Sequence, residues 1–183
     1  LKTERLNMTQ AVSEFNQQAL SLVKTIAANT IFDDVNTSGA NAFSEMPFPT
    51  RKTEAWKYTS LHALTKQNFN QSVDAVNAKT APVEFSIDGL DSIELVFING
   101  QFQADLSSNE MIDGLQLVRF SEATDEQLAL IEKYLGKTAE TERNLFTALN
   151  NAQVQDGVLV FVGKNIQLTK PIQIVNISVA QNQ

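Results

Sequence analysis

The sequence lacks cysteine and has a single histidine, His62. Without thiolates it has no disulfide framework and no sulfur ligand for a metal, and one imidazole cannot form a metal site by itself. No apolar run reaches the roughly 18 residues of a transmembrane helix, and residues 1–30 lack the pattern of a secretion signal. We therefore expect a cytoplasmic chain that does not bind a membrane and holds no metal or cofactor of its own.

Catalytic motifs are also missing. The seven glycines are scattered, so no glycine-rich phosphate-binding loop exists. Ser60 lies near His62, but the segment does not have the pattern of a nucleophile elbow. We expect His62 to be an exposed or locally hydrogen-bonded histidine and not a catalytic base. Acidic residues are frequent between 84 and 143, where paired carboxylates could hydrolyse glycosides, although such an excess of charge is normally a solvated face. We expect no enzymatic activity.

The 183 residues are 43% hydrophobic and 19% charged, which is typical of a soluble globular protein. The net charge of −7 argues against sequence-independent binding to nucleic acid or to anionic membrane. The acidity is concentrated in residues 84–155, which carry four basic and 13 acidic residues. Any contact with a polyanion must therefore be local.

The first half of the chain predicts helices. Apolar residues spaced three and four apart predict a helix over residues 9–28, with one face formed by Val12, Phe15, Ala19, Leu22 and Ile26. In residues 29–46 the apolar residues do not recur at a regular spacing, and this segment is interpreted as a mobile loop or a short helix. Another short helix is expected over residues 60–66.

The middle of the chain alternates between strand and helix signals. Residues 83–87 alternate like a strand, and residues 93–98 predict a strand that Asn99-Gly100 folds back onto Gln101-Phe102. Thr124 and Gln127 form a capping box that begins a helix ending near Gly136, and a further helix is expected over residues 141–152.

Beyond Gly157 the apolar residues predict short strands at residues 158–162, 166–168, 172–174 and 177–179. Such strands with brief corners are typical of a β-helix or a sandwich, and too few remain to close either. We expect an α+β chain with a helical N-terminal domain and a small β-hairpin or sheet at 1–152, and the first strands of a second domain at 153–183. The last strand edge could pair with another chain in a non-native self-association.

The densest chemical cluster lies between residues 51 and 59. Cations interleaved with aromatic rings can bind single-stranded nucleic acid, but this patch offers few phosphate contacts and the rest of the chain is acidic. The structural interpretation has Trp56 and Tyr58 buried, with Arg51 or Lys57 stacked on them or paired with Glu54. The candidate residues, as a structural motif or a partner contact, are Arg51, Lys52, Glu54, Trp56, Lys57 and Tyr58.

Residues 48–61, FPTRKTEAWKYTSL, resemble the N-terminal signature of the SufD branch of the SufB/SufD family, the scaffold proteins of Suf iron–sulfur cluster assembly. Three further segments agree in order, at residues 95–102, 144–150 with Asp156-Gly157, and 170–172. Together they cover residues 47–175. The arginine–lysine–tryptophan block favours SufD over its sister SufB.

The resemblance implies a helical N-terminal domain, then a right-handed parallel β-helix, then a helical domain that binds the ATPase SufC. It implies SufB and SufC as partners, sulfur-donor proteins as further candidates, and a transient iron–sulfur cluster on the full complex. The residues that build the cluster would lie beyond Gln183, so no catalytic or metal-binding residue is assigned. The chain itself would be an N-terminal fragment.

Three interpretations remain open. As a docking module, the apolar helix face or the basic aromatic block would contact SufB or a sulfur donor. As a structural cap, which we favour for most residues with docking as a secondary role, the same segments would only seal the open end of the β-helix. The alternative to a Suf scaffold is a purely structural cap of a β-helix protein with another role. As a carbohydrate-active β-helix enzyme, the chain would need two carboxylates facing each other across a groove.

Overall fold

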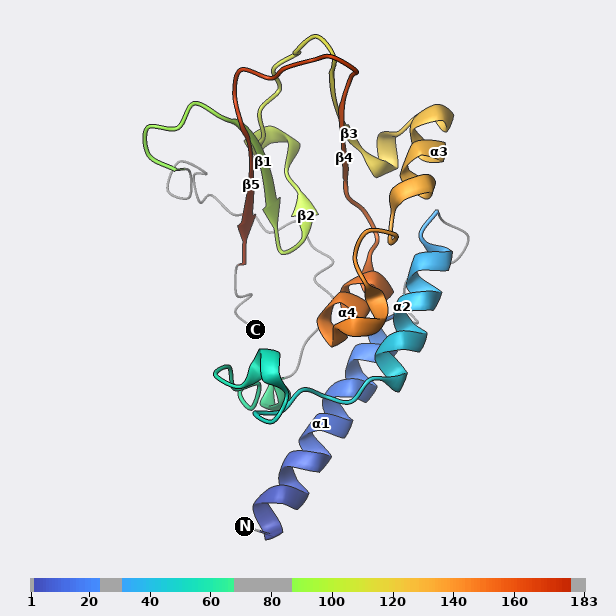
Figure 1. Ribbon diagram of the computed structural model, residues 1–183, viewed down its shortest axis with the longest axis vertical. Coiled ribbons are helices and arrows are strands. Elements are labelled where there is room, and N and C mark those ends of the chain that lie inside the picture. Colours follow the sequence, from blue (N-terminus) through green and yellow to red (C-terminus); the bar gives the residue numbers. More distant parts are fainter. Residues whose placement is uncertain (1, 24–30, 68–86, 179–183) are drawn as a thin grey trace. The chain divides into compact units, whose positions relative to one another are not determined.

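The computed structural model describes residues 2–23, 31–67 and 87–178. Within these ranges the chain forms four α-helices and five strands (Figure 1). The helices are α1 (Lys2–Val23), α2 (Asp33–Glu45), α3 (Asp125–Tyr134) and α4 (Leu145–Gln153). The strands are β1 (Ile93–Ile98), β2 (Gln101–Phe102), β3 (Leu115–Arg119), β4 (Val158–Val162) and β5 (Ile172–Ile177). The expected α+β class is confirmed.

The chain divides into two units, each assembled from two separate segments. The first unit comprises residues 1–71 and 132–155, and the second comprises residues 72–131 and 156–183. None of the described helices is long and apolar enough to cross a membrane. The expected division into domains at 1–152 and 153–183 stays a prediction.

The core of the first unit joins α1, α2 and α4. It contains the buried side chains Phe15, Ala19, Phe43, Leu145 and Ala148. Phe15 and Ala19 belong to the apolar face predicted for residues 9–28, whereas Ile26 lies outside the described residues. The helix itself begins earlier than predicted, at Lys2. The amphipathic pattern therefore identified which face of α1 is buried, but not where the helix begins.

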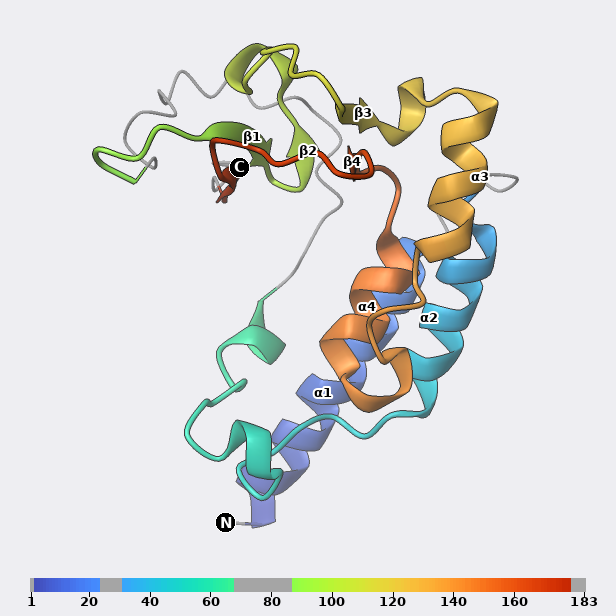
Figure 2. The same cartoon turned by 45° about the horizontal axis from the view of Figure 1, so that its top comes forward.

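Residues 33–45 form a helix, so the alternative of a mobile loop at 29–46 is wrong for this part of the segment. The buried positions of α2 are Asn36, Gly39 and Phe43, which recur at helical spacing and contact α4. The two helices lie side by side in Figure 2. Only one of these three residues is a large apolar residue. The hydrophobic period is weak here because α2 packs through a glycine and an asparagine.

Asn144 begins α4. Its side-chain Oδ1 accepts hydrogen bonds from the main-chain N–H groups of Phe146, at 2.9 Å, and Thr147, at 3.3 Å. These are donors that the first turn of a helix leaves without an intrahelical partner. The helix predicted over 141–152 is thus a 3₁₀ turn at Thr141–Arg143 followed by α4. The short helix predicted over 60–66 is reduced to a 3₁₀ turn at Leu64–Lys66.

A three-stranded sheet in the second unit has the order β2-β1-β5. The predicted hairpin is confirmed: β1 pairs antiparallel with β2, placing Ile98 opposite Gln101. Asn99 and Gly100 have φ values of +48° and +81°. Two successive positive φ angles are what a tight two-residue hairpin turn requires, and the Asn-Gly pair tolerates them. Of the strand predicted at 83–87, residues 83–86 lie outside the described residues and Ile87 is not in a strand.

The C-terminal strands pair with segments far earlier in the chain. β5 is parallel to β1, with Ile93 opposite Ile172 and Ile98 opposite Ile177. β4 is antiparallel to β3, with Leu115 opposite Val162. The described residues therefore do not show a right-handed parallel β-helix. Residues 166–168, predicted as a strand, connect β4 to β5 without forming one.

The capping box that precedes α3 is confirmed. The Thr124 N–H donates to Gln127 Oε1 at 2.9 Å, and the Gln127 N–H donates to Thr124 Oγ1 at 3.4 Å. Each side chain thus satisfies a main-chain donor at the start of the helix. α3 runs from Asp125 to Tyr134, close to the predicted end.

Candidate docking surface

The basic aromatic block lies in the first unit, in consecutive turns after Pro47 and Pro49. The Thr53 hydroxyl accepts from the Thr50 N–H at 3.1 Å, and the Thr50 hydroxyl accepts from the Lys52 N–H at 3.2 Å. A 3₁₀ turn at Glu54–Trp56 follows, and the Thr59 N–H donates to the Trp56 carbonyl at 3.1 Å. Two threonine side chains thus hold the main chain in a compact conformation that displays its longer side chains outward.

Trp56 is half-buried and packs on α4. Its ring centroid lies 5.2 Å from that of Phe146, with the ring planes inclined at 49°. This tilted arrangement is a favourable geometry for two aromatic rings. The expectation that Trp56 contacts its own chain is confirmed, and the contact is with a residue 90 positions later in the sequence.

A shallow hollow of about 500 Å³ opens beside this aromatic pair. Asn150 is exposed at its border, and Thr147 is half-buried. The amide of Asn144 is committed to capping α4, and the amide of Asn151 donates to Thr141 Oγ1 at 2.8 Å. The hollow thus combines an apolar wall with groups that can form hydrogen bonds. It is lined by Trp56, Ala139, Asn144, Phe146, Thr147, Asn150 and Asn151.

Tyr58 is 89% exposed, so the expectation that it is buried is wrong. Lys57 Nζ lies 5.3 Å from the Tyr58 ring centroid, as expected for a cation stacked on this aromatic residue. Arg51, Lys52 and Lys57 are all exposed, and none forms an ion pair with another described residue. Glu54 is exposed as well, and the predicted pairing of Glu54 with Arg51 or Lys57 is absent from the described contacts.

We call Arg51, Lys52, Trp56, Lys57 and Tyr58, together with the hollow, the aromatic–cation surface. It carries three cations, and the exposed Glu54 is the one anion within residues 51–58, in a chain whose net charge is −7. Its cations are therefore not neutralised by their neighbours.

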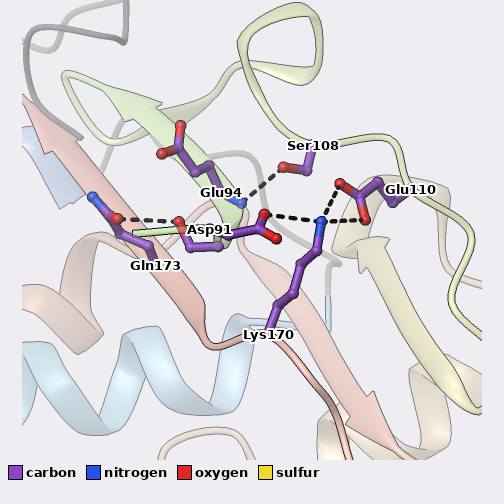
Figure 3. A network of polar contacts seen from close by, with 7 residues as sticks. Asp91, Glu94, Ser108, Glu110, Lys170 and Gln173 are labelled. Carbon is purple, nitrogen blue, oxygen red and sulfur yellow. Dashed lines mark hydrogen bonds and ion pairs between the residues drawn. The ribbon is translucent and has the colours of Figure 1, made fainter. Parts of the chain in front are cut away.

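A second polar cluster lies in the second unit, around Lys170 (Figure 3). The Lys170 ammonium is 2.9 Å from Asp91 Oδ1 and 3.2 Å from Glu110 Oε1. Hydrogen bonds to Asp91 and then to Glu110 raise the pKa of Lys170 above its usual 10.5. The lysine ties the segment before β1 and the loop after β2 to the start of β5, and this is a structural role.

The described residues contain no group of three or more histidine, aspartate or glutamate side chains that could hold a metal ion. The hollow beside Trp56 has no carboxylate in its lining. A second hollow of about 260 Å³, between α1 and the turn at 64–66, has one carboxylate, that of Glu14. His62 is exposed, and its main-chain N–H lies 3.4 Å from Ser60 Oγ.

Residues 7–174 match the model of the SufBD protein N-terminal region. This match covers most of the 183 residues. The chain belongs to the SufBD family. The resemblance drawn from residues 48–61 is therefore confirmed for the SufBD family, and the choice of SufD over SufB stays a prediction.

The chain is similar to three curated SufBD proteins. It is 22% identical over 178 residues to the iron-sulfur cluster assembly SufBD family protein slr0076 of Synechocystis sp., covering 97% of this chain and 39% of that protein. It is 42% identical over 55 residues to slr0074 of the same organism, covering 30% of this chain and 12% of that protein. It is 37% identical over 59 residues to the chloroplastic iron-sulfur cluster assembly SufBD family protein ABCI8 of Arabidopsis thaliana. This match covers 32% of this chain and 11% of that protein. The chain thus spans about two fifths of the first relative.

In this SufBD chain, the sequence identified the exposed cations and the tryptophan but not the second half of the surface. Phe146, Thr147 and Asn150 belong to α4, which the sequence places far from Trp56. Phe146 lies within the helix predicted over residues 141–152, and that was the available signal. Which aromatic residue it meets depends on how the helices pack.

Proposed function

We propose that this chain is the N-terminal region of a SufD-like scaffold subunit and acts with SufB and SufC in iron–sulfur cluster assembly. In this role it is a docking region and not an enzyme, and it works in the cytoplasm. The SufBD family match over residues 7–174 is the observation that carries the proposal. The names of all three relatives describe iron–sulfur cluster assembly, which supports a role of this chain in the same process.

In this proposal the iron–sulfur cluster is cargo of the whole complex. The chain has no cysteine, and thiolates are the principal ligands of such clusters. Residues elsewhere in the complex would therefore bind the sulfur and iron. SufC would supply ATP hydrolysis, and a sulfur donor would be a further transient partner.

We also propose that the strands beyond Gly157 lead into a right-handed parallel β-helix, whose open end this region caps. Apolar side chains of β4 and β5 support this part of the proposal. Ile174 is 59% exposed, and Val160, Phe161 and Val162 are also exposed. Further strands that cover these side chains would remove apolar surface from water.

A carbohydrate-active β-helix enzyme is the weaker alternative. It needs two carboxylates facing each other across a groove, and neither the hollow beside Trp56 nor the one beside Glu14 is lined by such a pair. The family match also favours cluster assembly.

The proposal is tested by co-expressing the full-length protein, with a tag, together with SufB and SufC from the same organism. We expect one complex containing all three proteins on size-exclusion chromatography. A SufB–SufC complex that forms normally while the tagged protein elutes alone would contradict the proposal.

Deleting residues 1–46 from the full-length protein is not a clean test of docking. The deletion removes Phe15, Ala19 and Phe43 from the core of the first unit. The loss of these buried side chains would unfold the first unit, and any loss of binding would then result from unfolding and not from the loss of a docking surface. Substitutions of exposed side chains are the appropriate test, and the aromatic–cation surface provides them.

A further inference from the structure

We propose that the aromatic–cation surface binds an acidic peptide segment of a partner protein, and that this segment carries one large apolar side chain. The apolar side chain enters the hollow beside Trp56 and Phe146, while flanking carboxylates pair with Arg51, Lys52 and Lys57. This inference rests on the proposed docking function and states the chemistry that the partner must present.

The hollow supplies the apolar part of the recognition. Trp56 is fixed by its contact with Phe146 at 5.2 Å and is not fully buried, so it offers apolar surface in a defined position. The hollow has a volume of about 500 Å³ and is wide open to solvent, so it can receive a side chain at the surface without enclosing it. A rigid aromatic anchor in a hollow is the typical centre of a protein–protein contact, because it buries a large area at little cost in side-chain entropy.

The polar border of the hollow suits a peptide main chain. Asn150 is exposed, and its amide can donate to a carbonyl and accept from an N–H group of an extended peptide. The half-buried Thr147 offers a hydroxyl on the same helix. Hydrogen bonds from these groups would orient the peptide without requiring a particular side chain.

The charges favour an acidic occupant. Arg51, Lys52 and Lys57 are exposed and form no ion pair with a described residue, whereas the whole chain has a charge of −7. Among the anions of neighbouring segments, Glu140 is paired with Arg143 at 2.8 Å, whereas Glu54 and Glu142 are exposed and have no ion pair among the described contacts. Within residues 51–58 three cations stand against one anion, Glu54, and this local excess attracts a segment that carries several carboxylates.

A nucleic acid fits these observations less well than a peptide. Its affinity comes mainly from many phosphate contacts, and the chain outside Arg51, Lys52 and Lys57 has a net charge of −10. Successive bases also need several exposed stacking platforms, whereas Trp56 is half-buried against Phe146 and Tyr58 is the one ring of this surface that is largely exposed. Binding to a nucleic acid is therefore an outcome that would overturn the proposal.

The direct test uses a fluorescein-labelled synthetic peptide with three glutamates on each side of one phenylalanine. Its fluorescence anisotropy is measured during titration with the 183-residue chain. The controls are the same peptide with lysine in place of glutamate, the same peptide with glycine in place of phenylalanine, and a single-stranded oligothymidylate of equal charge. We expect the acidic phenylalanine peptide to bind most tightly, and its affinity to fall as salt is added.

Trp56 provides a second readout because it is the only tryptophan in the chain. Unlabelled peptide that enters the hollow should change the intensity or wavelength of tryptophan emission, with the same midpoint as the anisotropy titration. Anisotropy that rises without any change in tryptophan emission would place the peptide elsewhere and overturn the proposal.

Charge is tested with a triple variant, Arg51→Ala, Lys52→Ala and Lys57→Ala. We expect about tenfold weaker binding of the acidic peptide, equivalent to about 1.4 kcal/mol. The matched control is Lys133→Ala, Lys137→Ala and Lys164→Ala, which has the same net charge and also removes exposed lysines. Binding by the control should stay within about twofold of the unmodified chain, and an equal loss in both variants would contradict a local surface.

The apolar contact is tested with Trp56→Ala, which should reduce the preference for the phenylalanine peptide over the glycine peptide to about one. Trp56→Phe should retain most of this preference, and it keeps the test valid if Trp56→Ala does not fold. Circular dichroism of each variant separates misfolding from lost binding. An unchanged preference in a folded Trp56→Ala variant would overturn the proposal.

The two proposals can fail separately. If the acidic peptide does not bind, or oligothymidylate binds more tightly, the inference fails, whereas a complex with SufB and SufC would still support the proposed function. If the peptide binds as expected but SufB and SufC do not co-purify with the full-length protein, the inference stands and the proposed function fails.

Discussion

Asn36 shows how one polar side chain joins two helices of the first unit. It is buried in α2, and its Nδ2 donates to the carbonyl oxygens of Asn151, at 2.9 Å, and Val154, at 3.0 Å. These carbonyls lie at the C-terminal end of α4, where a helix has acceptors without intrahelical partners. The asparagine therefore satisfies main-chain groups that burial would otherwise leave unpaired.

Asn36→Asp should destabilise the first unit by about 2–4 kcal/mol at neutral pH, because it replaces two donors with a buried carboxylate that faces two carbonyls. Urea unfolding followed by circular dichroism measures this loss. Asn41→Asp, at an exposed position of the same helix, is the control and should cost about 0.5 kcal/mol or less. Equal losses in the two variants would show that the hydrogen bonds of Asn36 contribute little.

Lys170 illustrates a residue whose contribution depends on pH. Its pKa is raised above 10.5 in the folded chain by hydrogen bonds to Asp91 and Glu110, so folding favours the protonated form. This contribution is fully present below pH 10.5 and is lost as the pH rises through the raised pKa. The pH window therefore lies on the alkaline side.

Lys170→Gln should lower the stability of the second unit slightly at pH 7, and the difference from the unmodified chain should disappear in strongly alkaline solution. Unfolding curves recorded at pH values below and above 10.5 test this dependence. Lys164→Gln, at an exposed lysine nearby in the sequence, should change stability little at any pH. A Lys170→Gln effect that persists unchanged at the alkaline end would contradict the assigned ion pairs.

At the scale of elements, the packing of α2 on α4 depends on a glycine. A Cβ atom at Gly39 would lie 2.7 Å from the Ala148 carbonyl oxygen and 2.8 Å from the Asn151 carbonyl carbon. Both are main-chain atoms, which cannot move aside as a flexible side chain can. The two helices can therefore approach this closely only because residue 39 has no side chain.

Gly39→Ala should destabilise the first unit by about 1–3 kcal/mol through overpacking, although alanine is the better helix former by about 1 kcal/mol. Chemical denaturation measures the change. Ser38→Ala, one residue earlier and exposed, should leave stability unchanged or raise it by a few tenths of a kcal/mol. Stabilisation by Gly39→Ala would mean that the helices are farther apart than in this structure.

Elements with local signals were predicted well, and elements that depend on distant partners were not. The Asn99-Gly100 hairpin and the Thr124 capping box were correct because each is held by residues at most a few positions apart. α2 was left open between loop and helix because its buried face includes Asn36 and Gly39, which have no hydrophobic periodicity. After Gly157 the prediction was correct for β4, divided β5 into two strands and added a strand at 166–168 that does not form. The partners of β4 and β5, which are β3 and β1, were not predicted.

At the scale of the whole molecule, each unit combines an early and a late segment of the chain. The first unit contains residues 1–71 and 132–155, whereas the second contains residues 72–131 and 156–183. Neither unit can therefore be completed from one continuous stretch. Truncation of the chain after α4 should therefore affect the two units differently.

A chain shortened to residues 1–155 should keep the first unit and lose the sheets of the second. It contains α1, α2 and α4 but lacks β5 and β4, so Val96 and Ile98 lose Val175 and Ile177. Hydrogen exchange followed by NMR should show protected amides in α2 and α4 and rapid exchange in β1 and β3. Protection of β1 equal to that in the 183-residue chain would contradict this expectation.

The candidate site was partly predictable. The sequence placed Arg51, Lys52, Trp56 and Lys57 together, because they are neighbours along the chain. It did not predict the partner of Trp56, and it predicted wrongly that Tyr58 is buried, since burial depends on which distant segment covers a side chain.

By itself the sequence determined the local conformations and the family: the hairpin at Asn99-Gly100, the capping box of α3, the buried face of α1 and the SufBD signature. Only the tertiary structure decided that β5 lies parallel to β1, that Gly39 lets α2 approach α4, and that Phe146 holds Trp56 beside a hollow. The physical reason is the separation along the sequence over which each kind of interaction acts. Torsional preferences and hydrogen bonds to near neighbours are encoded within a few residues, whereas pairing and burial require contacts between segments about 80 to 110 residues apart.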